Sequence, residues 1–297
     1  RYSKLAADKD DIVALKHYAY FLYTGQGTPV DKLESLKYYQ IIADKGDALA
    51  ARNCLIIIDE EKLIDRKARQ YLRYAKMGSD LGDPECQYRR GAIYADGDLV
   101  EQDLPKAAEL FQLSAEKGFL DAKYKYGLFL YEGYGIEENQ EKSLQWIKKA
   151  SDEGHHRASI KYANIILYEK NEEEKDKIEF ALNLLKEEAD QGFTEAMIIY
   201  HDYITNTDYN PTKDEINEAI NYLKMAVDKN DDEATLTYAR CYLRSGELKD
   251  IPKCLELLRK LVNKNYPYSI NLLIDTLLHC KKPITDDDLF EVTSLYK

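Results

Sequence analysis

The sequence of 297 residues lacks the patterns that usually indicate catalysis or metal binding. Its five cysteines form no Cys-x-x-Cys pair and no short regular spacing, which argues against a zinc site and against a disulfide framework. There is no His-Glu-x-x-His motif, and His17, His201 and His279 have no cysteine or aspartate at the local spacing of a catalytic triad. The adjacent His155 and His156 are predicted to be solvated side chains at a corner between two helices. We therefore expect no metal ion, no cofactor and no enzyme.

The sequence also lacks an excess of positive charge, and it lacks long apolar segments. The chain has 42 Lys and Arg against 54 Asp and Glu, a formal net charge of −12, and no dense basic block that would attract a phosphate backbone. Apolar runs such as Cys54–Ile58 are far shorter than the ~20 residues of a membrane span. These features predict neither nucleic-acid binding nor membrane insertion.

The cellular compartment follows only indirectly from the sequence. No Asn-x-Ser/Thr acceptor for glycosylation occurs, and the cysteine usage does not suit an oxidising compartment, so a cytoplasmic location is favoured. The sequence opens on Arg1 inside an apparent helix, which indicates a piece of a longer chain. A secreted or ER-lumenal location stays open if a signal peptide precedes it.

Small residues recur along the chain at a fixed period. They are separated by steps of 36 and then 38 residues, and each begins a helical apolar pattern: Ala14, Ala50, Cys86, Ala122, Ala158, Ala196 and Ala234. A period of this length is typical of a repeat protein. Four residues further on, one helical turn away, a tyrosine stands in five of the seven units, which predicts a core position.

A second helical pattern follows in each unit and ends on a glycine or an asparagine. These terminating residues are Gly46, Gly82, Gly118, Gly154, Gly192, Asn230 and Asn265. Gly and Asn tolerate the left-handed backbone conformation that closes many helices. Apolar residues ten, seven and three positions earlier form a stripe too narrow for a core of its own, so the units must stack.

The pattern predicts one all-α domain over residues 1–297, built of antiparallel helix pairs in about seven to eight repeats. Residues 1–11 are interpreted as the tail of a preceding repeat, and 267–297 as a degenerate C-terminal repeat that has a helix N-cap at Thr285. The full repeats are predicted at 12–47, 48–83, 84–119, 120–155, 156–193, 194–231 and 232–266.

The unit reads A-x-Y-x-Y-G-x-x-L-Y-x-G-x-G followed by K-S-L-x-W-x-x-x-A-x-x-G, most clearly over Ala122 to Gly154. In this it resembles the Sel-1-like repeat, a relative of the tetratricopeptide repeat, over nearly the whole chain. The second, fifth and sixth units lack the Gly-x-Gly turn, which leaves their loop geometry open. The resemblance implies a right-handed α/α superhelical solenoid that serves as a scaffold or adaptor for a protein or peptide partner.

By analogy with tetratricopeptide arrays, residues two, six and nine positions after each small residue are expected to line a concave groove. The candidates for partner binding are Tyr20, Tyr23, Arg52, Tyr88, Tyr124, Leu128, Tyr131, Asn164, Asp202 and Arg240. Tyrosine and arginine dominate interface energetics because they bury a large area and keep a polar group. The alternative is that these residues pack between repeats, and the sequence does not decide between the two.

Two further interpretations remain open. Ser114-Ala115-Glu116-Lys117 matches the S-x-x-K pattern of penicillin-recognising enzymes, but no K-T-G or S-D-N follows, so a β-lactam-binding or hydrolytic enzyme is only an alternative. The acidic loop from Glu172 to Asp176 could contact a basic partner, although such charge runs are usually solvated.

Overall fold

The computed structural model describes residues 11–169, 175–206, 209–243, 250–280 and 283–295, and within these ranges the protein is helical and has no strand. The predicted tail at 1–11 and the glutamates of the loop from Glu172 to Asp176 fall almost wholly outside the described residues. The chain separates into two compact units, one up to Ala158 and one from Ser159 onward. Each unit is described by itself.

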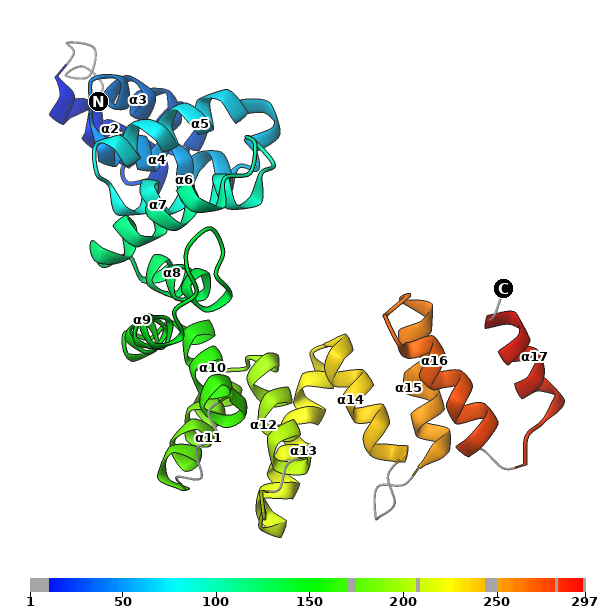
Figure 1. The fold of residues 1–297 in the computed structure, drawn as a ribbon. Helices are drawn as coiled ribbons and strands as arrows, with labels where there is room; N and C mark the ends of the chain where they lie inside the picture. The colour runs from blue at the N-terminus through cyan, green and yellow to red at the C-terminus, as the bar shows by residue number, and fades with distance from the viewer. Residues whose placement is uncertain (1–10, 170–174, 207–208, 244–249, 281–282, 296–297) are drawn as a thin grey trace. The chain divides into compact units, whose positions relative to one another are not determined.

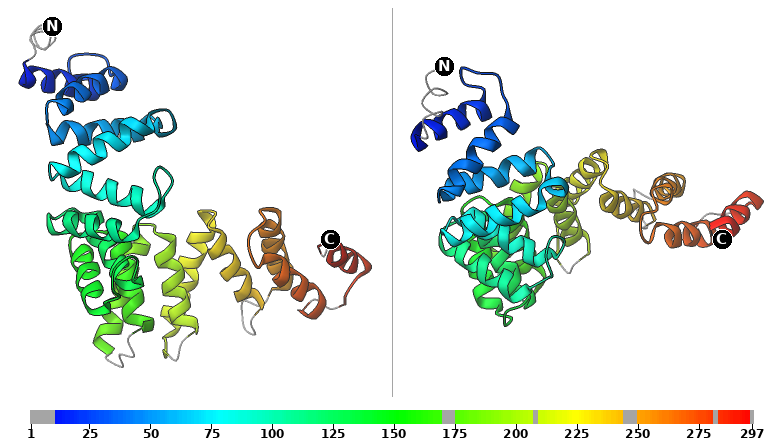
Figure 2. Two further views of the ribbon diagram at one scale, coloured as in Figure 1. Left: turned by 45° about the horizontal axis from the view of Figure 1, so that its top comes forward. Right: turned by 90° about the horizontal axis from the view of Figure 1, so that it is seen from above.

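The first unit is a stack of helix pairs (Figures 1 and 2). From α2 to α9, each helix packs against the next one along the chain. Its helices are α2 (Ile12–Thr24), α3 (Lys32–Asp44), α4 (Ala48–Glu60), α5 (Ile64–Asp80), α6 (Pro84–Asp96), α7 (Leu104–Glu116), α8 (Leu120–Glu132) and α9 (Gln140–Asp152). The even-numbered helices are the first helices of the repeats and the odd-numbered ones are the second helices.

The second unit continues the same alternation in its described residues. Helix α10 (His156–Asn164) begins before the division and runs into a π-helical turn, η1 (Ile165–Glu169). The later elements are α11 (Lys175–Asp190), α12 (Thr194–Asn206), α13 (Lys213–Asp228), α14 (Asp232–Leu243), α15 (Ile251–Asn263), α16 (Ser269–Asp275), a π-helical turn η2 (Thr276–Cys280) and α17 (Asp286–Leu295). Thr285 caps α17 as predicted, because its hydroxyl accepts from the N–H of Asp288 at 3.3 Å.

The predicted end of each second helix is confirmed by the backbone. All seven terminating residues have a positive φ, from 55° at Asn265 to 98° at Gly192. The residue that follows, here called the corner residue, returns a hydrogen bond to the helix: the N–H of Asp83 donates to the carbonyl of Gly78 at 2.9 Å, and that of His155 to Ala150 at 3.0 Å. This bond satisfies a carbonyl that the helix end would leave open.

Several corner residues also begin the next helix. Asp83 accepts from the N–H of Cys86 at 2.9 Å, Asp231 from Ala234 at 2.9 Å, and the Nδ1 atom of His155 from Ala158 at 3.0 Å. An oxygen or nitrogen acceptor at this position satisfies one of the first N–H groups of a helix. One residue therefore closes one repeat and starts the next.

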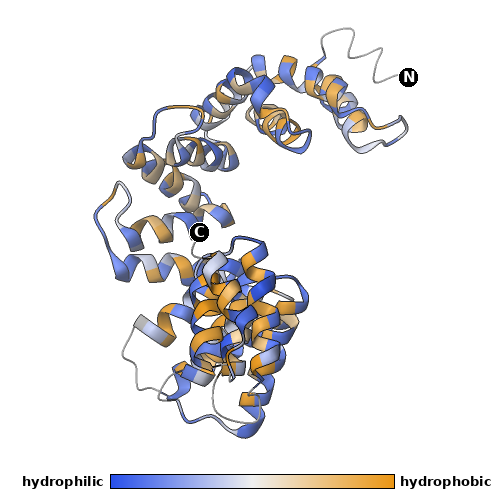
Figure 3. Cartoon of the chain, turned by 90° about the vertical axis from the view of Figure 1, so that its right-hand side faces the viewer, coloured by the Kyte–Doolittle hydropathy of each residue, from blue (hydrophilic) through white to orange (hydrophobic). Residues whose placement is uncertain are grey.

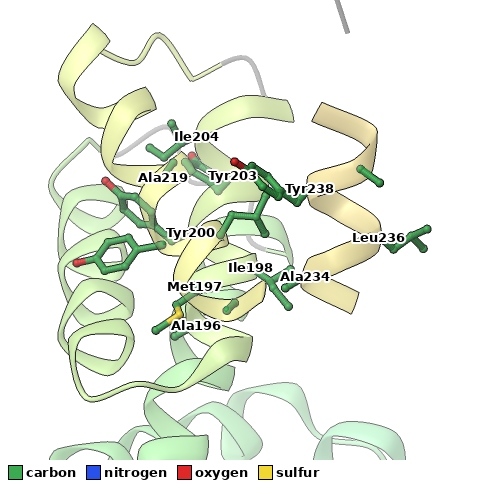
Figure 4. Close-up of a cluster of buried hydrophobic side chains, with 14 of the residues drawn as sticks. Ala196, Met197, Ile198, Tyr200, Tyr203, Ile204, Ala219, Ala234, Leu236 and Tyr238 are labelled. Atoms are coloured by element: carbon green, nitrogen blue, oxygen red, sulfur yellow. The ribbon is translucent and has the colours of Figure 1, made fainter. Parts of the chain in front are cut away.

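Apolar residues alternate with polar ones along each described helix (Figure 3). In the second unit, α12 supplies Ala196, Met197, Tyr200 and Tyr203 to a core that Ala219 of α13 and residues of α14 complete (Figure 4). Tyr200 is fully buried and meets Tyr222 edge to face, with ring centroids 5.6 Å apart. The predicted core role of Tyr200 is thus observed.

At two glycines the neighbouring helix leaves no room for a side chain. A Cβ atom placed on Gly78 in α5 would lie 2.3 Å from Sγ of Cys86 in α6, and one on Gly127 in α8 would lie 2.7 Å from Ile147 in α9. At the second site the buried hydroxyl of Ser143 donates to the carbonyl of Gly127 at 2.8 Å, and Ser35 bonds to Ala19 in the same way at 2.7 Å. These contacts set the distance between neighbouring helices.

Candidate functional site

In the first unit, the residue two places after each small residue contacts the corner residue that closes its repeat and leads into the first helix of the next repeat. The four contacts are an ion pair between Lys16 and Asp47, an ion pair of 3.4 Å between Arg52 and Asp83, and ring contacts between Tyr88 and Phe119 (5.2 Å between centroids) and between Tyr124 and His155 (4.6 Å). Arg52, Tyr88 and Tyr124 therefore make contacts between repeats. Their predicted role in partner binding has to be compatible with those contacts.

Around Tyr88 the repeats enclose a pocket of about 650 Å³. Its residues come from α5, α6, the loop after α6 and the start of α8. The apolar wall consists of Ile64, Tyr71, Tyr88, Ala92, Ile93, Leu99 and Phe119. The charged residues are Asp65, Glu85, Arg89, Asp96, Asp98 and Asp121. The pocket thus combines aromatic rings with five carboxylates and one guanidinium.

The guanidinium of Arg89 is engaged by two carboxylates. Its Nε and Nη2 atoms donate to Glu85 at 3.0 and 2.8 Å, and Nη1 donates to Asp59. Burial alone would lower the pKa of Arg89, but the bonds to Glu85 and Tyr71 raise it. Burial raises the pKa of Asp59, and Arg89 opposes this rise. Within the described part of the chain, the buried Oδ1 atom of Asp59 receives no hydrogen bond. The positive charge of Arg89 is therefore taken up by Glu85 and Asp59 and does not neutralise the other carboxylates of the pocket.

Asp121 at the pocket edge is bound to the corner histidine. Because Nδ1 of His155 accepts from a backbone N–H, its proton is on Nε2, which lies 3.3 Å from Asp121 and donates to it. Burial lowers the pKa of His155, and Asp121 only partly opposes this. The neutral imidazole leaves the negative charge of Asp121 in place. The prediction that His155 is a solvated corner residue is wrong, because its side chain is only 12% exposed and packs on the ring of Tyr124.

The other candidates of the first unit lie apart from this pocket. Tyr23 donates its hydroxyl to Glu60 at 2.8 Å. Tyr20 is 46% exposed and borders a smaller cavity of about 210 Å³. Leu128 and Tyr131 are half-buried on α8. The structure brings only Tyr88 of the predicted set into this pocket, and places Arg52 and Tyr124 beside residues that line it.

The candidates of the second unit have other surroundings. Asn164 is half-buried on α10, and Arg240 is exposed on α14. Asp202 lies 3.0 Å from Nδ1 of His201, whose Nε2 lies 3.4 Å from Sγ of Cys241. Sequence reasoning missed this group because Cys241 stands in the next repeat, whereas the search for a triad considered local spacing only.

A family model for the Sel1 repeat matches residues 12–47, 84–119, 120–155, 210–231 and 233–266, more than half of the chain. The chain belongs to the Sel1 repeat family. Proteins of this family commonly act as scaffolds for protein interactions and are typically not enzymes. A comparison with curated proteins gives no match.

Solved Sel1 repeat structures share the fold. The protective antigen c5321 of uropathogenic Escherichia coli, which displays an SLR fold, superposes with a TM-score of 0.78 at 17% identity, over 99% of this chain and 62% of that one. A Sel1 repeat protein from Oxalobacter formigenes gives a TM-score of 0.66 at 21% identity, over 85% and 97%. This chain thus spans less than two thirds of the antigen.

The serine of the S-x-x-K pattern is buried and makes a hydrogen bond to the backbone of the repeat array. Ser114 is 0% exposed, and its hydroxyl donates to the carbonyl of Pro84 at the start of the same repeat at 2.6 Å, while Lys117 donates to Gly82 of the preceding repeat at 2.6 Å. The serine thus holds two helices of one repeat together, and the lysine joins two repeats. Among the residues that the structure describes, no three His, Cys, Asp or Glu side chains are grouped so as to hold a metal ion. The described helices are each too short or too polar to span a bilayer.

Proposed function

We propose that this Sel1 repeat protein is a non-catalytic scaffold that binds a protein partner through the pocket around Tyr88, and that the pocket receives a lysine or arginine side chain. The observation that carries the proposal is the composition of the pocket, in which four carboxylates that Arg89 does not bind line the cavity together with aromatic rings: Asp65, Asp96, Asp98 and Asp121. A family role in protein interaction supports the scaffold part of the proposal.

The pocket suits a cation for two physical reasons. Acidic side chains attract a basic group across the solvent and so favour encounter with a basic partner. The rings of Tyr88 and Phe119, 5.2 Å apart, offer π faces to which an ammonium or guanidinium group is attracted. The aliphatic stem of a lysine or arginine could at the same time cover Ala92, Ile93 and Leu99.

The neighbouring contacts keep this site in shape. Tyr88 packs against Phe119 and also against Phe111. The ring centroids of Tyr88 and Phe111 are 5.5 Å apart. The orientation of Tyr88 is therefore fixed before a partner arrives. Burial raises the pKa of the Tyr88 hydroxyl, which therefore stays protonated and can donate a hydrogen bond. A site ordered in advance loses less entropy on binding.

The proposal is tested by fluorescence anisotropy with a labelled peptide in which lysine and glycine alternate. The pocket variant Asp96→Asn/Asp98→Asn removes two exposed carboxylates, and the matched control Glu137→Gln/Glu138→Gln removes two exposed carboxylates from the loop between α8 and α9. An exposed ion pair contributes about 0.2–1 kcal/mol, so we expect the pocket variant to raise Kd about five-fold and the control to leave it nearly unchanged.

Equal weakening by both variants would show that the peptide senses only the net charge of the protein, and would refute the pocket as the site. Equal binding of a peptide in which glutamate replaces lysine would refute recognition of a cation. Either result would return partner binding to the other candidates, such as Tyr20, Leu128 and Tyr131.

A further inference from the structure

A cysteine, a histidine and an aspartate meet in the second unit. Cys241 lies on α14, and His201 and Asp202 lie on α12, the first helices of two successive repeats that pack on each other. Sγ of Cys241 is 3.4 Å from Nε2 of His201, and Nδ1 of His201 is 3.0 Å from Oδ1 of Asp202. The three side chains form one chain of polar contacts.

The order of these contacts fixes the role of each ring nitrogen. A carboxylate can only accept, so Nδ1 of His201 carries the proton that it donates to Asp202. Because the pKa of His201 is about 9, Nε2 is also protonated at pH 7 and faces Sγ of Cys241, whose thiol donates to the carbonyl of Thr237 at 3.4 Å. A positively charged imidazole next to a cysteine is a general way to make its sulfur more reactive.

The imidazole is held in place and is strongly basic. The side chain of His201 is 3% exposed, and Asp202 receives a further hydrogen bond from the side chain of Asn206 at 3.4 Å. Burial alone would lower the pKa of His201, but the bonds to Asp202 and Cys241 raise it to about 9. The groups that set this value are Asp202 on the same helix and Cys241 on the packed helix.

Cys241 differs from the other four cysteines. Cys54, Cys86 and Cys254 are buried, and burial raises the pKa of each thiol, to about 11 for Cys254. Cys280 is exposed. Cys241 is half-buried, which leaves part of its surface accessible, and among the described contacts it is the cysteine that meets an imidazole.

We propose that Cys241, His201 and Asp202 form an activated thiol, a covalent modification site for small electrophiles. This inference does not depend on the proposed function of the first unit. In the reaction with a haloacetamide, the thiol proton passes to water, Sγ forms a bond to the methylene carbon beside the charged imidazole of His201, the carbon–halogen bond breaks, and halide leaves. The adduct places new atoms on Sγ where α12 and α14 meet.

The test compares two cysteines within the same protein. The full chain is treated with limiting iodoacetamide at pH 7, and the alkylation rates of Cys241 and Cys280 are measured by peptide mass spectrometry. An ordinary exposed thiol is only a few per cent thiolate at this pH, so we expect Cys241 to react about five- to tenfold faster than Cys280 despite its lower exposure.

Two variants separate activation from simple access. His201→Gln removes the positively charged imidazole, and Asp202→Asn alters only a side chain that is 38% exposed. Both should bring the rate of Cys241 below that of Cys280, and far-UV circular dichroism checks that each variant is folded. A rate for Cys241 below that of Cys280 in the unmodified sequence would overturn the proposal. So would a fast rate that neither variant changes.

Discussion

The packing of Gly78 against Cys86 predicts a strong energetic coupling between α5 and α6. In Gly78→Ala the new Cβ would lie 2.3 Å from Sγ and 2.9 Å from Cβ of Cys86, while Ala51 closes the space at 3.4 Å. Overpacking of this kind costs about 1–3 kcal/mol, and the better helix propensity of alanine returns about 1 kcal/mol. We expect Gly78→Ala to lower the free energy of unfolding by about 1 kcal/mol.

The double variant is expected to recover that loss. Cys86→Ala alone removes a buried sulfur and should cost about 1 kcal/mol. With both changes the site holds two alanines, the pair that the chain itself has at the equivalent positions Ala150 and Ala158. The double variant should therefore match the unmodified protein, which gives a coupling energy of about 2 kcal/mol.

Guanidinium unfolding followed by the fluorescence of Trp146, which lies on α9 in the same unit, measures this coupling, with far-UV circular dichroism as a second signal. The reasoning is refuted if Gly78→Ala is as stable as the unmodified protein. It is equally refuted if the two single losses add in the double variant, since the contact would then not be the cause of either loss.

Two further predictions concern stability. Ser143→Ala should lower the free energy of unfolding by about 1 kcal/mol through loss of the buried bond to Gly127, as measured by the same denaturation; an unchanged value would mean that the hydroxyl bond contributes nothing. The pKa of His201 is about 9 in the folded protein and about 6.5 in the unfolded chain, so protonated His201 stabilises the fold fully below pH 6.5, and this stabilisation is lost as the pH rises through 9. Urea titrations from pH 6 to pH 9 should show that the free energy of unfolding declines by up to about 3 kcal/mol. The decline should be absent in His201→Gln.

The repeat architecture follows from local properties of the sequence. Glycine and asparagine are the residues that reach a positive φ at low cost, so their regular positions from Gly46 to Asn265 fix where each second helix ends. The apolar stripe, with members such as Leu36, Phe111 and Leu185, is buried because a narrow amphipathic face has no other way to leave water. Both signals lie within one repeat.

The site depends on contacts between repeats, and a single sequence carries no signal for these. The pocket around Tyr88 takes residues from three repeats, and its acidic character depends on the orientation of Arg89 towards Asp59 and Glu85. Likewise, Cys241 and His201 are brought together by the packing of α14 on α12. The groove analogy did not show that Tyr88 and Tyr124 contact the corner residues Phe119 and His155.

The contact between each first helix and the next corner residue changes its chemistry along the first unit. The ion pairs Lys16–Asp47 and Arg52–Asp83 join the early repeats, and the ring contacts of Tyr88 and Tyr124 join the later ones. Dissolved salt screens the attraction between partly exposed charges but leaves stacked rings unaffected. A rise in ionic strength should therefore weaken the contacts Lys16–Asp47 and Arg52–Asp83 more than the ring contacts of Tyr88 and Tyr124.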